Sequence, residues 1–164
     1  MTKRAARQKV DEILKEQFKY IYKRHTIDIN TFQLIFQMDS RTHELRMNFC
    51  FQESWCDVVC FISPTSLTPG TNEYWEALQC VNYVNWNVKS WGRFYIDLYG
   101  DLAYSLRLDY SVLESMPREA RTELETAVDY YADLFVPFLK VCQGKESFVQ
   151  ARKFIDEIYS FYFQ

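Results

Sequence analysis

Among the cysteines and histidines, whose side chains could ligate a metal or act in nucleophilic catalysis, the only close pair is Cys56 and Cys60. A structural zinc site needs four ligands, usually supplied by two such pairs or by cysteines together with histidines. No second close pair follows, and His25 and His43 each stand alone in polar segments. Both cysteines fall in a predicted strand, where residues four apart share a face. We therefore interpret them as buried free thiols and predict no metal site.

Nucleophilic catalysis would need a serine or cysteine beside a base, usually a histidine. The chain has no G-x-S-x-G motif, and its two isolated histidines give a triad little to build with. Its four glycines, at positions 70, 92, 100 and 144, form no phosphate-binding loop. The sequence therefore predicts no catalytic residue, no cofactor and no enzymatic activity.

Carboxylates occur in two groups. Asp97, Asp101 and Asp109 flank or end a predicted hairpin, where aspartate commonly bonds to the backbone, so we give them a structural role. A second group repeats at every fourth position of a predicted helix and consists of Glu125, Asp129 and Asp133. Such a row is mildly repulsive and usually solvated, although a partner rich in Lys or Arg could bind it. Both interpretations of this row stay open.

Aromatic residues make up 18% of the chain, which is a high share. Trp86 and Trp91 bracket a short loop, and Phe161 and Phe163 fall off the buried stripe of the last predicted helix. These four residues need either a further pocket in the same molecule or another subunit to cover them. We treat them as candidate interface residues and leave both alternatives open.

The bulk composition fits one soluble domain spanning residues 1–164, with 48% apolar and 25% charged residues. A net charge of −3 argues against a nucleic-acid binder. The basic opening residues precede no apolar run, so we expect no secretory signal. The longest uncharged stretch, residues 58–72, contains prolines and is too short to cross a bilayer. We expect a cytoplasmic protein whose five cysteines stay reduced, with no membrane association.

Apolar residues that recur every three or four positions predict four helices. They cover residues 6–22, residues 71–85, a long segment from Pro117 to Gly144, and a last segment from Ser147 onward. Pro137 should kink the long helix or end its first half. The second helix is expected to bury one side, which consists of Tyr74, Trp75, Leu78, Val81 and Val84.

Alternation of apolar and polar residues predicts strands at 30–38, 45–51 and 56–62 and a hairpin over 93–109 with a turn at Gly100-Asp101. The third strand is more uniformly apolar, as expected near the centre of a sheet. The residues expected in the core are Phe32, Leu34, Phe36, Met47, Phe49, Phe94, Ile96, Leu102, Tyr104 and Leu106.

These elements predict an α+β domain of two layers, with helices on one face of an antiparallel sheet of about five strands. Their expected order is α-β-β-β-α-β-β-α-α.

Several short motifs in this order resemble those of the YbjN family. They are Asn82 and Asn85 near a helix end, WGRFYID at 91–97, GDLAY at 100–104, RLD at 107–109 and YYADLFVP at 130–137. The resemblance implies the fold of type III secretion chaperones. It also implies a bacterial, non-enzymatic protein of a family described as regulators of sensory transduction. No catalytic or ligand-binding residue is carried over from the family.

Two functions fit these observations. The first is a protein-interaction module, a homodimeric chaperone-like adaptor or regulator that binds an extended client segment. The second is a small-molecule-binding protein or enzyme that uses an aromatic-lined pocket between sheet and helices. The lack of a nucleophile–base set favours the first, and the family resemblance favours a homodimer with Trp86 and Trp91 near its interface.

Overall fold

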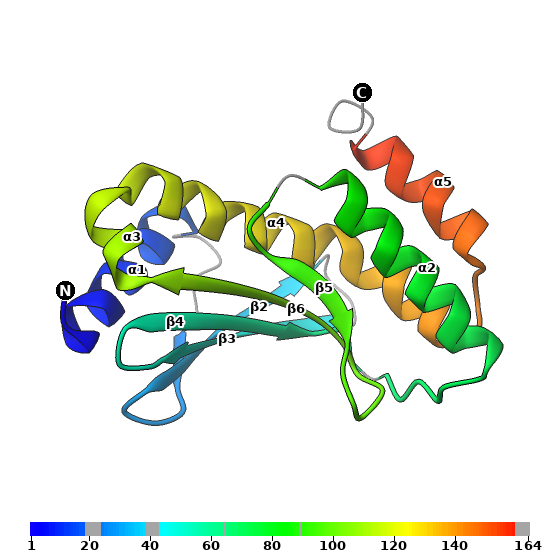
Figure 1. Ribbon diagram of the computed structural model, residues 1–164, viewed down its shortest axis with the longest axis horizontal. Coiled ribbons are helices and arrows are strands. Elements are labelled where there is room, and N and C mark those ends of the chain that lie inside the picture. Colours follow the sequence, from blue (N-terminus) through cyan, green and yellow to red (C-terminus); the bar gives the residue numbers. More distant parts are fainter. Residues whose placement is uncertain (19–23, 39–42, 64, 89, 160–164) are drawn as a thin grey trace. The chain divides into compact units, whose positions relative to one another are not determined.

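The computed structural model describes residues 1–18, 24–38, 43–63, 65–88 and 90–159 (Figure 1). It confirms the predicted α+β class, with helices and an antiparallel sheet. The order of elements is α-β-β-β-β-α-β-β-α-α-α, so the predicted order lacked one strand and one helix.

In the part of the chain that the structure describes, the strands form one open sheet of six in the order β1-β2-β3-β4-β6-β5, where about five were predicted. β4, the uniformly apolar strand, has a neighbour on each side, and β1 and β5 are the edges. The bounds are Arg24–Thr26 (β1), Thr31–Met38 (β2), His43–Phe51 (β3), Trp55–Phe61 (β4), Arg93–Ile96 (β5) and Leu102–Asp109 (β6).

The two elements that the sequence analysis missed are both short. β1 has three residues and pairs antiparallel with β2, placing Thr26 opposite Phe32. The helix α3 (Tyr110–Ser115) begins directly after β6 and has six residues. Neither is long enough to display a period of two or of 3.6, and this explains why the apolar pattern did not reveal them.

The four predicted helices are all present, each starting at a polar cap or at proline. Thr2 accepts a hydrogen bond from the Ala5 N–H at the start of α1 (Lys3–Gln17), and Thr71 caps α2 (Asn72–Asn87) in the same way. The long helix is α4 (Pro117–Cys142) and the last is α5 (Phe148–Tyr159). Residues 19–22 of the first predicted helix lie outside the described residues. None of the described helices combines the length and the apolar character needed to cross a membrane.

Pro137 lies inside α4, and the helix does not end at this proline but continues to Cys142. Its ring has no N–H to donate to the carbonyl one turn earlier. The apolar residues on both sides of the proline are buried, so tertiary packing holds the helix together. Apolar residues spaced by three or four, the spacing that predicted this helix, form its buried stripe, which includes Ala120, Leu124, Ala127, Val128, Tyr131, Leu134, Phe135 and Phe138.

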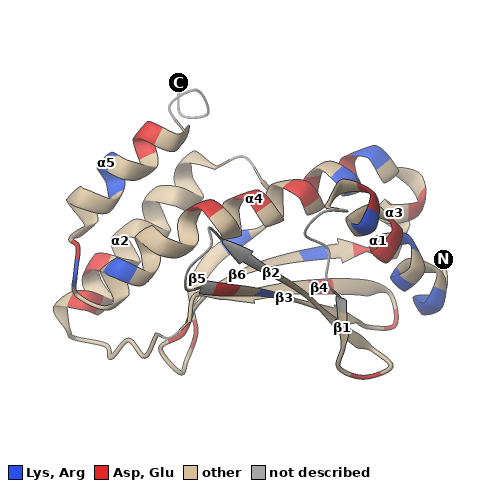
Figure 2. Cartoon of the chain, turned by 180° about the vertical axis from the view of Figure 1, so that it is seen from behind, with Lys and Arg blue, Asp and Glu red and all other residues tan. Residues whose placement is uncertain are grey.

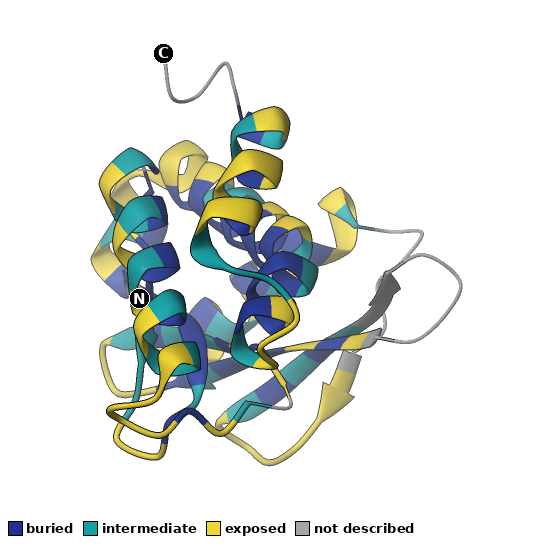
Figure 3. Ribbon diagram, turned by 90° about the vertical axis from the view of Figure 1, so that its right-hand side faces the viewer, coloured by how far each residue is buried: buried dark blue, intermediate teal, exposed yellow. Residues whose placement is uncertain are grey.

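The described residues group into two compact units, and β6 and α4 each run from one unit into the other. One unit comprises residues 1–60 and 105–132, and the other comprises residues 61–104 and 133–164. The prediction that residues 1–164 form a single domain stays a prediction. In Figure 3 the helices each carry a buried side and an exposed side, as amphipathic helices do.

In the first unit, aromatic rings of β2 and β3 form the centre of the core. Phe32 stacks on Phe49 with ring centroids 4.9 Å apart and lies 5.7 Å from Phe51. The register places Phe32 directly opposite Phe49, so the two side chains share the buried face. The guanidinium of Arg7 on α1 lies 5.5 Å from the Phe32 ring centroid. This cation–π contact covers the aromatic cluster on the side that faces α1.

In the second unit, Phe94 lies edge-on to two other buried rings. Its centroid is 5.1 Å from that of Tyr104 on β6 and 4.8 Å from that of Phe138 on α4. Gly92 lies against Tyr104 so closely that a Cβ atom there would be 1.9 Å from the phenol oxygen. The glycine of the WGRFYID motif is therefore required by packing.

The predicted register of the strands is confirmed where side chains are described. Phe94 is buried while Arg93 is exposed, and Ile96 is half-buried. Phe36 lies outside the residues whose side chains are described. The remaining predicted core residues are all buried, namely Phe32, Leu34, Met47, Phe49, Leu102, Tyr104 and Leu106.

We expect Gly100→Ala to destabilise the protein far more than Gly70→Ala. Both glycines have positive φ, 81° and 89°, so alanine carries a similar backbone strain of about 1 kcal/mol at either position. Only Gly100 is also confined, because a Cβ atom there would lie 2.1 Å from the Leu67 carbonyl oxygen. Urea unfolding followed by circular dichroism should show an additional loss of at least about 2 kcal/mol for Gly100→Ala.

Gly70→Ala is the matched control, since a Cβ atom at Gly70 meets nothing within 4 Å. Equal losses for the two variants would contradict the close approach of the hairpin turn to Leu67.

Candidate protein-interaction surface

The candidate site lies on α2 and α5, which pack side by side within one unit (Figure 1). Ser147 directly precedes α5, and its side chain accepts from the Gln150 N–H while the Gln150 side chain accepts from the Ser147 N–H. This is a reciprocal capping box. A carboxylate oxygen of Glu76 on α2 accepts the Phe148 N–H at 2.5 Å. The start of α5 is thus fixed to α2 by a charged group that also suits the positive end of a helix.

Tyr83 on α2 makes several contacts with α5. Its hydroxyl donates to Asp156, and its ring lies 5.9 Å from that of Phe148 in an edge-on arrangement. The Arg152 guanidinium lies 4.8 Å from the Tyr83 centroid and 3.7 Å from the Asp156 carboxylate. Burial and the bond to Asp156 raise the pKa of the Tyr83 hydroxyl above its ordinary value. None of these residues was predicted as a site residue, and their only signal in the sequence is the i, i+4 spacing of Arg152 and Asp156.

The outer side of α2 carries an exposed apolar stripe, and this corrects the sequence analysis. Trp75 and Leu78 were expected on the buried side, but Trp75 is 59% exposed and Leu78 is also exposed. Trp86 continues the stripe and is 87% exposed. The side that α2 buries consists of Ala77, Cys80, Val81 and Val84. This buried stripe is narrower than the predicted one, but its residues still recur every three or four positions. Its small alanine and cysteine allow α2 to pack closely against its neighbours.

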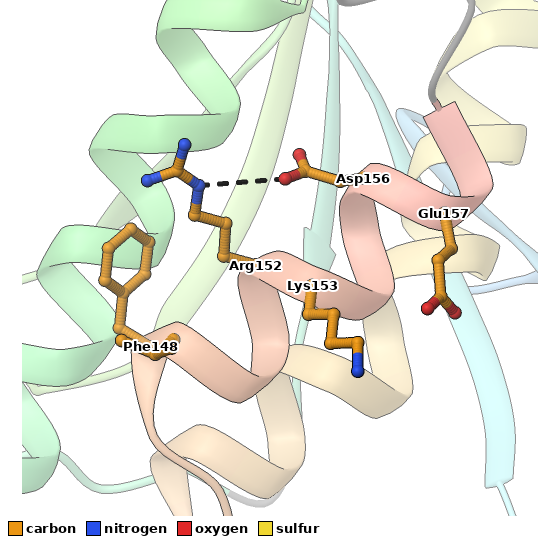
Figure 4. Close-up of a pocket in the computed structure, with 6 residues that line it drawn as sticks. Phe148, Arg152, Lys153, Asp156 and Glu157 are labelled. Atoms are coloured by element: carbon orange, nitrogen blue, oxygen red, sulfur yellow. Dashed lines mark ion pairs between the residues drawn. The ribbon is translucent and has the colours of Figure 1, made fainter.

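Among the hollows beside the contact between α2 and α5, two share a lining residue. The smaller, of about 220 Å³, is lined by Gln79, Asn82, Tyr83, Trp86 and Phe148. The larger, of about 710 Å³, follows α5 and is shown in Figure 4. Phe148 lines both hollows, so they are parts of one continuous surface. We call it the α2–α5 face, and its residues are Gln79, Asn82, Tyr83, Trp86, Phe148, Val149, Arg152, Lys153, Asp156 and Glu157.

Of the four predicted interface residues, the structure places Trp86 on the α2–α5 face. Trp91 is 47% exposed and lies in the loop between α2 and β5. Phe161 and Phe163 lie outside the described residues. The loop itself is held by Arg93, whose guanidinium donates to the carbonyls of Ser90 and Gly92.

The two asparagines of the motif have different surroundings. The Asn85 side chain bonds to the backbone of Phe94 in both directions, donating to its carbonyl at 2.8 Å and accepting its N–H at 3.0 Å. It therefore pairs with β5 as a neighbouring strand would. Asn82 lies exposed on the α2–α5 face.

The predicted acidic row on α4 is engaged within the chain at one position at least. Asp133 accepts a hydrogen bond from the Tyr159 hydroxyl at 2.9 Å. Glu125 helps to raise the pKa of Arg121, after the larger effect of Glu16. Asp129 is exposed. A role for Glu125, Asp129 and Asp133 in binding a basic partner stays a prediction.

The remaining groups considered for chemistry have structural surroundings. The Asp97 carboxylate accepts the N–H groups of Tyr99 and Asp101 and closes the hairpin turn. Cys56 and Cys60 are buried on one side of β4, and all five cysteines are free thiols. Within the described ranges, no three His, Cys, Asp or Glu residues converge as metal ligands would.

The chain was compared with models of protein families, with curated proteins and with solved structures, and none of the three comparisons found a match.

We expect most cysteines to react slowly in the folded protein. Burial raises the pKa of Cys80 and Cys142 to about 12 and raises those of Cys56 and Cys60 well above 9. Because the thiolate is the reactive form, labelling at pH 8 should be slower by at least about 100-fold for these four cysteines in the folded protein than in denaturant. A time course with a chromogenic disulfide reagent measures the rates.

In denaturant without reductant the same reagent should count five free thiols. A count of three or one would show that disulfides form in solution, and stoichiometric zinc by elemental analysis would contradict the prediction that the protein has no metal site.

Proposed function

We propose that this protein is a non-enzymatic protein-interaction module, a chaperone-like adaptor or regulator in a bacterial cytoplasm. In this proposal it acts as a homodimer and binds an extended segment of a client protein. The observation that carries the proposal is the exposure of Trp86 on the α2–α5 face.

A tryptophan held in this position is a strong candidate for a binding anchor. Large aromatic side chains contribute most to the binding energy of protein interfaces when a partner covers them. Trp75 lies eleven positions earlier on the same helix, about 16 Å away along its axis. Together with Leu78, the two indoles offer a partner an apolar strip of several turns. An interface of ordinary size buries about 800 Å² on each partner, and the strip would form its apolar centre.

The rigid support of the α2–α5 face also favours binding. Tyr83 of α2 contacts Asp156, Phe148 and Arg152 of α5 through a hydrogen bond, a ring contact and a cation–π contact, and these contacts fix α5 against α2. A surface that is ordered before binding loses little conformational entropy when a partner docks.

The resemblance to the YbjN family supports the same function. Its motif residues Asn85 and Gly92 have structural roles, in pairing with β5 and in packing against Tyr104. Motifs of this kind maintain a fold and are compatible with a non-enzymatic family. The net charge of −3 favours a protein partner over a nucleic acid.

One observation favours the alternative function, a small-molecule-binding protein or enzyme. The larger hollow, of about 710 Å³, falls in the size range of ligand pockets and has an aromatic residue beside charged ones. In the described residues, however, its lining comes from α5 alone, and this gives a ligand few converging contacts.

We expect Trp86→Glu to shift the protein from dimer to monomer, because it places a charge in the apolar strip. The unmodified protein should scatter light as a dimer of the 19.7 kDa chain at micromolar concentration. Truncation of a central tryptophan anchor commonly costs 2 kcal/mol or more, so the dissociation constant should rise by about 30-fold or more. Trp91→Glu tests the neighbouring loop in the same way.

Tyr99→Glu is the matched control, because Tyr99 is also 87% exposed but lies at the β5–β6 turn. It should leave the dimer intact. Circular dichroism should be unchanged in all variants. A monomeric unmodified protein would overturn the homodimer.

A further inference from the structure

The charges on the outer side of α5 follow an order that a single helix does not favour. Arg152 and Lys153 come before Asp156 and Glu157, so the acidic pair is nearer the C-terminal end (Figure 2). The helix dipole prefers the opposite order, with acidic residues near the N-terminus and basic residues near the C-terminus. A basic residue four positions before an acidic one is also the weaker arrangement of an i, i+4 pair.

An antiparallel second copy of the same helix would reverse this disadvantage. The acidic half of each helix would then face the basic half of the other. The two helix dipoles would also be antiparallel. The sequence R-K-x-x-D-E is therefore self-complementary under a two-fold axis, as an isologous interface requires.

The four charged residues divide into two pairs with different surroundings (Figure 4). Arg152 and Asp156 extend toward α2, where both contact Tyr83. Lys153 and Glu157 point away from α2 and are exposed. The side chains of Arg152 and Asp156 are also partly exposed, at 54% and 42%, but they already contact Tyr83 and each other, so the second pair is better placed to meet another molecule.

We propose that α5 pairs antiparallel with α5 of a second copy, with Lys153 of each chain facing Glu157 of the other. This inference rests on the proposed homodimer and specifies its helix pairing and register. The two-fold axis would pass at the level of residue 155, midway between the two charged positions. Val149, which is exposed one turn before Lys153, would extend the contact with an apolar side chain.

The charges would determine the register, and the apolar side chains would supply most of the affinity. Exposed ion pairs contribute little individually, but a like-charge pair across an interface disfavours the wrong arrangement. The α2–α5 face joins both components, because Phe148 links the hollow beside Trp86 to the outer side of α5.

A charge-exchange experiment tests the register directly. Lys153→Glu and Glu157→Lys should each weaken the homodimer, because each places like charges opposite one another twice. We expect the dissociation constant, measured by sedimentation, to rise by about tenfold in either variant. An equimolar mixture of the two should form a heterodimer at least as tight as the unmodified dimer.

The double variant Lys153→Glu/Glu157→Lys is the matched control. It has the same composition and net charge as the unmodified protein, and its paired charges are opposite again, so it should dimerise as the unmodified protein does. If net charge alone determined dimer affinity, the two single variants would differ from each other. Lys153→Glu makes the charge −5 and Glu157→Lys makes it −1, so general repulsion would weaken only the first. High salt should reduce the effect of both single variants.

The outcomes separate this inference from the proposed function. A dimer whose affinity is the same in all variants would overturn the α5 pairing and leave the homodimer standing. A dimer that resists Trp86→Glu but follows the charge-exchange pattern would support the α5 pairing and remove Trp86 from the interface. A monomeric unmodified protein would overturn both.

Discussion

The contact of Phe94 with its neighbours is the constraint on which the second unit depends. Its ring meets Tyr104 of β6 and Phe138 of α4, and its backbone bonds to Asn85 of α2. Phe94 therefore joins its own strand, β5, to three other elements, namely α2, β6 and the more distant α4. Gly92 is part of the same constraint, because only a residue without a side chain leaves room for the Tyr104 ring.

The α2–α5 face follows from this arrangement. Once Asn85 fixes the end of α2, the helix buries Ala77, Cys80, Val81 and Val84. The remaining positions must point outward, which leaves Trp75 and Trp86 in solvent. Tyr83 lies between the buried and the exposed sides of α2 and contacts Asp156 and Phe148 of α5. The exposure of the α2–α5 face is thus a consequence of how the core packs.

Much of the fold could be predicted because the periodicities are long and regular. β3 alternates over seven residues, from Leu45 to Phe51, and α4 keeps one apolar stripe across Pro137. β1 and α3 have three and six residues, which is too few for a period to be recognised. Pairing with β2 stabilises β1, and this tertiary interaction has no local sequence signal.

The candidate site was only partly predictable for a different reason. Trp86 was identified because it adjoined a loop, whereas Trp75 and Leu78 were assigned to the core because they are apolar. A helix with apolar residues on more than one side leaves open which side is buried. The choice depends on the size of the residues that fit against the partner elements, and this requires the structure. Tyr83 and Phe148 were missed because they meet only in three dimensions.

The distribution of the four tryptophans also determines what the protein's intrinsic fluorescence can report. Trp75, Trp86 and Trp91 are exposed, and Trp55 is half-buried under the Arg107 guanidinium. The emission of the folded protein therefore comes mostly from indoles in water, so its wavelength changes little on unfolding. A partner that covers the outer side of α2 would transfer Trp86 to an apolar environment and shift the emission to the blue. In this protein tryptophan emission would follow binding more closely than folding.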